Sequence, residues 1–492
     1  MKILLLNPPF IKRFSRTSRS PGVSKGGCVY YPIWLTYAAG ALEKKGHEVK
    51  LLDASGENLS LSETLFEIKE YGAELIVIDT VTPSFENDTK ILAEIKKQNS
   101  SAFITLVGDH VSVLPKKSLE QSKADAVAVR EYDFILCDLA EALKKKSSKD
   151  KKYLDLSEVK GIFWRKGRAI VTNNPAQPPT EKQLDWLPFV SQTYAKHLKL
   201  ENYFYPSVQY PQLTILTGRG CPNMCAFCKW PQTFSGHNYR KRSVKSVVSE
   251  FLWIQNNLPA VKEIMIEDDT LTQDKKRTIE LCKSLIAAES KLPWSCNARA
   301  DVPLEVLQWM KKARCRLMCV GVESADQQIL NNIHKGTTPQ GIKQFMKDSK
   351  KAGILVHGCF MFGNQGETAD TIRKTAKFAC ELNPDTAQFF PVMVYPGTET
   401  YTWAKKKGYL KAKKWGDWLN KDGTHKTLLS RPGLSAKDLN QLTDESRKKF
   451  YTRPRYVAAK VVQGIKHPKE LPRLAKGSLT LVKYLVKGKK EY

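Results

Sequence analysis

Two stretches of the chain alternate short apolar strands with amphipathic helices, and this alternation restricts the possible folds more than any other feature. The first stretch has predicted strands at residues 3–6, 49–52, 75–78, 103–107 and 126–129, with helical patterns between them. Such alternation is typical of a parallel sheet with helices on both faces. We therefore predict an N-terminal α/β domain, a Rossmann-like doubly wound parallel sheet, over residues 1–145.

A second alternating stretch begins after a polar, proline-containing segment. Its strands are predicted at residues 213–216, 263–266, 294–297, 317–320, 355–361 and 386–392. Six βα units at this spacing predict a partial (β/α)6 TIM-like barrel, whose chemistry is expected at the carboxyl ends of the strands. The predicted organisation is completed by a linker with a short β piece (146–205), the barrel (206–410) and a basic helical C-terminal region (411–492).

Three closely spaced cysteines follow the first strand of the second stretch. Cys221, Cys225 and Cys228 have the spacing C-x3-C-x2-C and come after Gly218 and Gly220. Close spacing lets one loop hold three corners of a cubic iron–sulfur cluster by thiolate ligation, which leaves one iron open for another ligand. The alternative is a zinc site, but zinc modules use a fourth Cys or His in paired spacing.

The cysteine loop and the strand ends that follow it together resemble the radical S-adenosylmethionine (radical SAM) superfamily. The matching segments, in order, are 217–228, 267–270, 297–301, 321–324, 363–368 and 395–398. The resemblance implies a [4Fe-4S] cluster on Cys221, Cys225 and Cys228, whose open iron binds the amine and carboxylate of S-adenosylmethionine (SAM). One electron from the cluster then yields a 5′-deoxyadenosyl radical, which abstracts hydrogen from an unactivated carbon.

The resemblance also implies which residues hold the cosubstrate. Arg299 suits the carboxylate because a guanidinium can form a bidentate pair with it. Asp268 or Asp269 would bind the amine, Glu323 would bind the ribose hydroxyls, and Phe227 would pack near the adenine, with Ser324 as a further SAM contact. A strand-end salt bridge or helix cap is the simpler alternative for each of these residues taken alone.

The N-terminal stretch resembles the cobalamin-binding domain of B12-dependent radical SAM enzymes. The resemblance assigns cobalamin contacts at the strand ends to Asn7, Thr80, Thr82, Ser84, Gly108, His110 and Glu131. The motif D-x-H-x-x-G, which supplies a histidine to cobalt in other B12 enzymes, is absent. We therefore expect no histidine below the cobalt and interpret His110 as a hydrogen-bonding residue. The alternative is a domain that has lost its cofactor.

The chain is strongly basic, with a formal net charge of +29, and the residues after Ser446 carry 14 Lys and Arg against two Glu. Lysines beside apolar residues at 478–487 predict peripheral contact with an anionic membrane, and a solvated helical cap is the alternative. Nucleic acid is not an expected partner because the glycines and aromatics of RNA-binding modules are missing. With no secretory signal and no run of 18 apolar residues, we expect a cytoplasmic protein, peripheral at most on the inner membrane face.

These features together predict an enzyme that methylates an unactivated carbon of a small, hydrophobic molecule, with methylcobalamin as the methyl donor. Its cofactors would be the [4Fe-4S] cluster, SAM and cobalamin, and its electron donor a protein such as flavodoxin or ferredoxin. The similarity to hopanoid- and porphyrin-modifying members of the family favours a lipid-like substrate. Two alternatives stay open: a non-methylating radical cyclase or rearrangement enzyme, and an RNA-modifying or RNA-binding protein.

Overall fold

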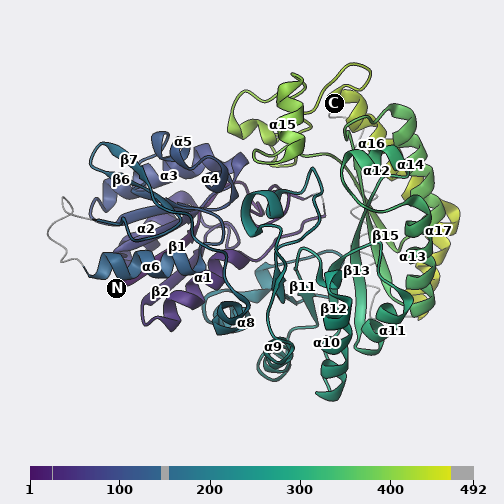
Figure 1. Cartoon of the computed structure of the whole chain (residues 1–492), viewed down its shortest axis with the longest axis horizontal. Coiled ribbons are helices and arrows are strands. Elements are labelled where there is room, and N and C mark those ends of the chain that lie inside the picture. Colours follow the sequence, from purple (N-terminus) through teal and green to yellow (C-terminus); the bar gives the residue numbers. More distant parts are fainter. Residues whose placement is uncertain (25, 146–154, 467–492) are drawn as a thin grey trace.

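The computed structural model describes residues 1–24, 26–145 and 155–466. Its first sheet has seven strands in the order β2-β1-β3-β4-β5-β6-β7 (Figure 1). The first five are parallel, whereas the β6–β7 hairpin adds two antiparallel strands at one edge. The strands are β1 (Lys2–Asn7), β2 (Glu48–Asp53), β3 (Leu75–Asp79), β4 (Phe103–Val107), β5 (Ala126–Ala128), β6 (Ile162–Lys166) and β7 (Ala169–Thr172).

Helices cover both faces of this sheet, as its near-continuous apolar strands require. Alternate residues of β1 point to opposite faces: Ile3 and Leu5 belong to one buried cluster, and Leu4 and Leu6 to another. The first cluster includes side chains of α1 and α6, and the second those of α2 and α3. The helices are α1 (Ile33–Lys44), α2 (Leu61–Tyr71), α3 (Phe85–Gln98), α4 (Asp109–Val113), α5 (Pro115–Glu120) and α6 (Asp133–Lys144), and a 3-10 turn, η1 (Thr82–Ser84), precedes α3. The predicted doubly wound sheet is confirmed.

The strand order places a switch point between β1 and β3. The chain leaves β1 toward β2 on one side and later returns to β3 on the other, so the connections diverge there. Ligands of doubly wound sheets bind in the crevice at the carboxyl ends of such strands. In this chain those ends carry Asn7 and Thr80.

The second sheet contains six parallel strands in the order β15-β14-β13-β12-β11-β8, the reverse of their order along the chain. The sheet curls into a partial barrel (Figure 1). Because β8 and β15 are its two edge strands, the barrel stays open between them. The strands are β8 (Gln212–Ile215), β11 (Glu263–Ile266), β12 (Trp294–Arg299), β13 (Cys315–Glu323), β14 (Leu355–Phe362) and β15 (Thr386–Pro391). The predicted six-stranded partial barrel is confirmed.

The connections of the barrel are mostly helical. Its helices are α9 (Val244–Asn257), α10 (Lys275–Ala287), α11 (Leu304–Lys312), α12 (Gln327–Asn332), α13 (Pro339–Ala352), α14 (Ala369–Leu382) and α15 (Glu399–Lys406). The cysteine segment lies between the short strands β9 (Gly218–Arg219) and β10 (Arg240–Lys241) and includes a π-helical turn, η4 (Pro231–Ser235); a 3-10 turn, η5 (Leu271–Gln273), follows β11. Between the two sheets the chain forms α7 (Glu181–Trp186), α8 (Val190–His197) and a turn, η3 (Leu200–Asn202).

The C-terminal region becomes helical later than predicted. Residues 411–435 form loops with one 3-10 turn, η6 (Trp415–Trp418), and helices begin only at α16 (Ala436–Tyr451) and α17 (Pro454–Lys466). Gly416, Gly423 and the Pro432-Gly433 pair explain why the earlier residues do not continue a helix. The predicted membrane segment at 478–487 lies outside the described residues. Within the described part of the chain, no helix has the length and apolar character that a membrane crossing needs.

Candidate active site

The three cysteines lie on one loop at the carboxyl end of the barrel and line a cavity of about 2390 Å³. Cys221 and Cys225 are buried, and Cys228 is partly exposed. Polar groups surround the sulfurs: Asn223 Nδ2 lies 3.3 Å from Cys221 Sγ, and Arg299 Nη1 lies 3.9 Å from Cys225 Sγ. Three cysteines on one loop at one cavity wall match the requirement for holding an iron–sulfur cluster.

The chemistry of the cysteines favours a bound cation. Cys228 is partly exposed toward the cavity, and the protein around its sulfur displaces enough water to raise the pKa of the thiol above its usual range; Asp269 and the neighbouring Cys225 raise that pKa further. Without a metal the thiol form is therefore favoured, whereas iron ligation requires the thiolate. Positive charge on iron would compensate for the burial and the repulsion, so these residues fit a cluster.

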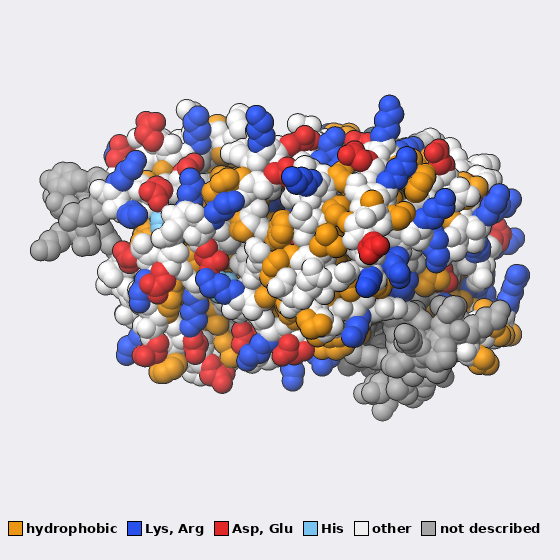
Figure 2. Space-filling model, turned by 90° about the horizontal axis from the view of Figure 1, so that it is seen from below, with side chains coloured by type: hydrophobic (Ala, Val, Ile, Leu, Met, Phe, Trp, Pro, Cys, Tyr) orange, Lys and Arg blue, Asp and Glu red, His pale blue; other side chains and the backbone are white. Residues whose placement is uncertain are grey.

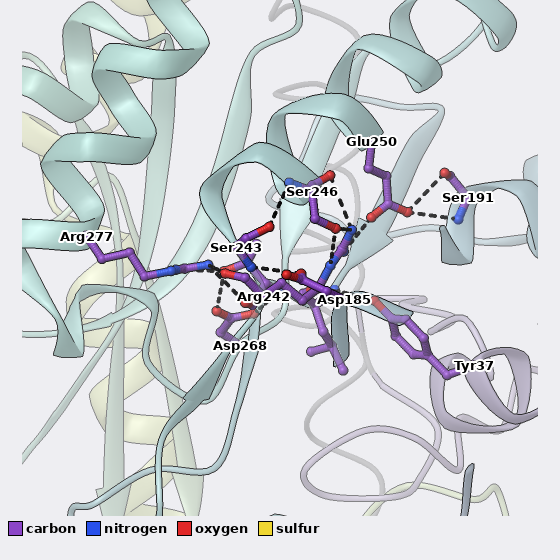
Figure 3. Close-up of polar contacts among 11 residues, drawn as sticks. Tyr37, Asp185, Ser191, Arg242, Ser243, Ser246, Glu250, Asp268 and Arg277 are labelled. Atoms are coloured by element: carbon purple, nitrogen blue, oxygen red, sulfur yellow. Dashed lines mark hydrogen bonds and ion pairs between the residues drawn. The ribbon is translucent and has the colours of Figure 1, made fainter. Parts of the chain in front are cut away.

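A buried polar network holds the backbone just before this loop (Figure 3). Arg242 Nη1 donates to the carbonyl of Leu216 at 3.0 Å and to Glu250 Oε2 at 2.5 Å. Arg277 Nη2 donates to the carbonyls of Thr217 and Arg242 at 3.0 and 2.9 Å. Because the carbonyls of Leu216, Thr217 and Arg242 each accept from a buried guanidinium, the start of the cysteine loop is fixed relative to the barrel.

The predicted SAM-binding residues divide into two groups. Phe227, Asp269, Arg299 and Glu323 line the cavity together with the cysteines. Asp268 instead belongs to the network behind the loop, where its two oxygens accept from the amide and hydroxyl of Thr217 at 2.6 and 2.7 Å. Ser324 is fully buried at the start of the β13–α12 connection and accepts from the amide of Asp326 at 3.1 Å.

Three cations of the cavity wall were not predicted from the sequence. Lys335 is buried, pairs with Glu323 at 2.9 Å and lies 5.8 Å from the ring centroid of Phe227. Arg19 reaches from the N-terminal domain to pair with Glu267, lies 3.7 Å from Asp269 and stacks over Trp230. Lys229, next to Cys228, pairs with Asp109 of the first domain. Of these three residues, only Lys229 could have been singled out from the sequence, because it directly follows Cys228.

At the carboxyl ends of the first sheet, several predicted cobalamin residues come together. Asn7 donates to Asp53 at 2.6 Å and accepts from Arg16 at 2.8 Å. Gly108 packs against Thr80 with φ +112°, and a Cβ there would lie 2.2 Å from the carbonyl oxygen of Thr80. Only glycine therefore allows β3 and α4 to approach so closely.

His110 is buried in a largely apolar contact rather than exposed toward the cavity. Its Nδ1 lies 3.2 Å from Thr82 Oγ1, and its ring packs against Phe85 and Trp415. Burial and, to a smaller extent, the charge of Lys117 together lower the pKa of His110 to about 3, so the imidazole is neutral near pH 7. These contacts agree with the interpretation of His110 as a hydrogen-bonding residue.

Two other predicted cobalamin contacts have partners within the protein. Ser84 donates to Asp88 at 2.5 Å, and Asp88 is paired with the buried Arg16. Glu131 forms ion pairs with Arg219 and Arg240 of the cysteine segment, so it connects the first sheet to the barrel. Both predicted contacts, the Ser84 hydroxyl and the Glu131 carboxylate, therefore bind other side chains of the protein in this structure.

Unpartnered polar groups at the same sheet edge fit a large amide-rich cofactor. Thr80 Oγ1 and Tyr132 Oη are buried and have no hydrogen-bond partner among the residues that the structure describes. A buried hydroxyl without a partner costs free energy, so such groups in a folded protein point to a ligand or water that completes them. The amide side chains of cobalamin can both donate to and accept from these hydroxyls, so the residues present fit the group.

Comparison with known proteins identifies both halves of the chain. The profile of the Radical SAM superfamily matches residues 215–379, and that of the B12 binding domain matches residues 20–139. The chain is 29% identical to an uncharacterized methyltransferase, PH0819, of Pyrococcus horikoshii, over 92% of this chain and 93% of the relative. It is 25% identical to the anaerobic magnesium-protoporphyrin IX monomethyl ester cyclase of Rubrivivax gelatinosus, over 82% of this chain and 69% of that protein.

The fold resembles that of a solved enzyme, the radical SAM methyltransferase TsrM from Kitasatospora setae. The TM-score is 0.70 for its complex with tryptophan and aza-SAM, at 18% identity, covering 90% of this chain and 88% of TsrM. For the complex with cobalamin and a [4Fe-4S] cluster it is 0.68, covering 90% of each. The order of domains, the cysteine loop and both profile matches agree: the chain consists of a B12 binding domain followed by a domain of the Radical SAM superfamily.

Proposed function

We propose that this enzyme transfers a methyl group to an unactivated carbon of a hydrophobic small molecule. The observation that carries the proposal is the large cavity that begins at the cysteine loop and continues to α17. Its far wall contains Met361, Phe389, Phe390 and Met393 of the barrel and Val457 of α17. Ligand sites are mostly apolar with a few polar groups, and apolar surface prevails in this cavity.

Bound together, the cluster and SAM would supply a carbon-centred radical, and cobalamin would supply a methyl group. The residues of the chain position these groups and keep water away. In this proposal Arg299 holds the carboxylate of SAM and Asp269 its amine, which is supported by their position in the cavity wall beside the cysteines. Glu323, which pairs with Lys335, would accept from ribose hydroxyls, with Phe227 beside the adenine.

A pair of matched substitutions separates the roles of the two neighbouring aspartates. We expect Asp268→Ala to lower the iron content of the purified enzyme, because the amide of Thr217 loses its acceptor behind the cysteine loop. We expect Asp269→Ala to keep the iron but to raise the KM for SAM roughly 10- to 100-fold, the equivalent of losing one charged hydrogen bond. Iron analysis and SAM-cleavage kinetics provide the two measurements. The reverse pattern would assign amine binding to Asp268.

Methyl transfer itself is tested with labelled SAM. Anaerobic enzyme is incubated with methyl-deuterated SAM and a metabolite extract from a strain that lacks the gene. We expect a product that carries the deuterated methyl group, formed by the natural enzyme and not by its Cys225→Ala variant. An enzyme-dependent product without label would contradict methylation and favour ring formation or rearrangement. That second function is supported by the similarity to the Rubrivivax gelatinosus cyclase.

We further propose that a hydrophobic substrate enters past α17 from an anionic membrane surface. Val457, Val461 and Ile465 occupy one face of this helix at a spacing of four residues and are 51%, 58% and 73% exposed. Val461 and Ile465 also line the cavity mouth. Acidic side chains lie mainly over the first sheet, at the left of Figure 2, whereas Lys and Arg prevail over the barrel at the right. This surface would also suit an acidic electron donor such as flavodoxin or ferredoxin.

Vesicle binding tests the proposed membrane contact. We expect the enzyme to sediment with vesicles that contain anionic lipid, and Val461→Glu with Ile465→Glu to reduce the bound fraction at least tenfold, because burial of each side chain contributes about 1.5–3 kcal/mol. Ile286→Glu is the matched control, since Ile286 is 41% exposed on α10, outside the cavity wall. Equal binding of all three proteins would contradict entry at α17.

A further inference from the structure

A second group of metal-ligating side chains lies inside the barrel, on strands rather than on the cysteine loop. Cys319 is on β13, and His357 and Cys359 are on β14. Both sulfur atoms and one ring nitrogen lie within 4.8 Å of one another. In the parallel register Cys319 is opposite His357, and Gly321 is opposite Cys359. Because alternate residues of a strand share a face, this register directs the three side chains to one point.

The distances are those of a metal site. Cys319 Sγ and Cys359 Sγ lie 3.7 Å apart. Two thiolates bound tetrahedrally to zinc at about 2.3 Å are separated by roughly 3.8 Å. A disulfide would require about 2.05 Å. The His357 ring is held by Thr386, whose Oγ1 lies 2.7 Å from Nδ1, and such outer contacts orient the histidines that ligate metals.

We propose that Cys319, His357 and Cys359 bind a zinc ion in the wall of the barrel cavity. Two thiolates and one imidazole form a donor set that prefers zinc among the common divalent cations, and three protein ligands leave the fourth position open. All three residues line the same cavity as the cluster cysteines, so this position faces the space proposed for the substrate.

The zinc site is separate from the iron–sulfur site. Cys319 precedes Glu323 by four residues on the same strand, and at about 3.3 Å per residue this places it roughly 13 Å deeper in the barrel. The zinc would therefore bind water or a donor atom of the substrate at the end remote from the radical chemistry. This assignment of the open position rests on the proposed function, whereas zinc binding itself does not.

A neighbouring pair of thiols provides a matched comparison. Cys296 on β12 and Cys315 on β13 are also in side-chain contact, and both are buried. Among the described residues, no third metal-ligating side chain lies close enough to form a three-ligand site with this pair. Removing these two cysteines takes the same number of sulfur atoms from the barrel and leaves the proposed site intact.

The test measures zinc in the full-length chain without turnover. Cys221, Cys225 and Cys228 are replaced by alanine so that the cluster loop cannot take up metal, and the protein is loaded with zinc anaerobically and desalted. We expect one zinc ion per chain, a loss of at least tenfold when Cys319→Ala and Cys359→Ala are added, and retention when Cys296→Ala and Cys315→Ala are added instead. Cobalt in place of zinc should give the visible spectrum of a tetrahedral thiolate site, again lost only with Cys319 and Cys359.

X-ray absorption at the zinc edge provides a second test if a variant fails to fold: it uses zinc-loaded natural enzyme with its iron–sulfur cluster in place, so that Cys221, Cys225 and Cys228 are occupied by iron. We expect a zinc shell with two sulfur atoms and lighter N or O ligands for the remainder. No zinc binding, a shell without sulfur, equal zinc in both double variants, or a Cys319–Cys359 disulfide in anaerobically purified protein would each overturn the proposal. Since none of these measurements requires methyl transfer, failure of the proposed function would leave the zinc result unchanged.

Discussion

Replacing Cys225 with alanine is expected to abolish both the iron–sulfur chromophore and all cleavage of SAM. Cys225 is buried in the wall of the cavity, with Arg299 Nη1 3.9 Å from its sulfur. One loop supplies three thiolates to the cluster, and loss of one removes a corner ligand that no other cysteine of the loop can replace. Visible absorption, iron content and the release of 5′-deoxyadenosine provide the measurements.

Cys282→Ala is the matched control for this substitution. Cys282 is fully buried on α10, outside the cavity wall, so its removal takes away a thiol without touching the site. We expect this variant to keep its chromophore and its SAM cleavage. Continued cleavage by the Cys225→Ala enzyme would show that the cluster is held elsewhere and would contradict the site described above.

The fold could be predicted from the sequence because its signals are local. Apolar strands and amphipathic helices have different periodicities, and each βα unit can be recognised within about 30 residues. The observed β4 (Phe103–Val107) and β11 (Glu263–Ile266) have the predicted bounds. The β6–β7 hairpin was expected only as a short β piece of the linker, because its pairing with β5 depends on a partner more than 30 residues away.

The site was predictable only where a residue belongs to a continuous motif. The three cysteines and Arg299 occur in segments that can be read directly, and all four line the cavity. Arg19 pairs with Glu267 across 248 residues, and no periodicity or spacing reports such a contact. Likewise, Asp268 and Asp269 are indistinguishable in sequence, and only the strand geometry directs one behind the loop and the other into the cavity.

Glu131 could be interpreted from the sequence either as a cofactor contact or as one partner of an ion pair. Its position at the carboxyl end of β5 suggested a cofactor contact, yet its carboxylate is buried between Arg219 and Arg240. The carboxyl end of β5 faces the second domain, and the Glu131 carboxylate therefore pairs with arginines of that domain. The ion pairs between Glu131, Asp133 and the two arginines therefore connect the cobalamin-binding half to the loop that holds the cluster.

Replacing Arg219 with methionine is expected to lower the free energy of unfolding by about 3–5 kcal/mol, the usual cost of removing one partner from a buried ion pair. Arg219 is 3% exposed, donates to Asp133 at 2.6 Å and to Glu131 at 3.1 Å, and its guanidinium packs over Trp34. Methionine fills a similar volume but leaves Asp133 buried without its cation. Urea denaturation followed by fluorescence measures the change.

Arg373→Met provides the control for Arg219→Met, because Arg373 pairs with Asp370 on the surface and both side chains are largely exposed. Exposed pairs contribute about 0–1 kcal/mol, so the control should unfold close to the natural enzyme. A loss below about 1 kcal/mol for Arg219→Met would mean that water reaches Asp133 and that the interface is less closed than the structure shows. A large loss, shared by Glu131→Gln, would instead identify this ion-pair network as the connection that keeps the cobalamin-binding domain over the cluster.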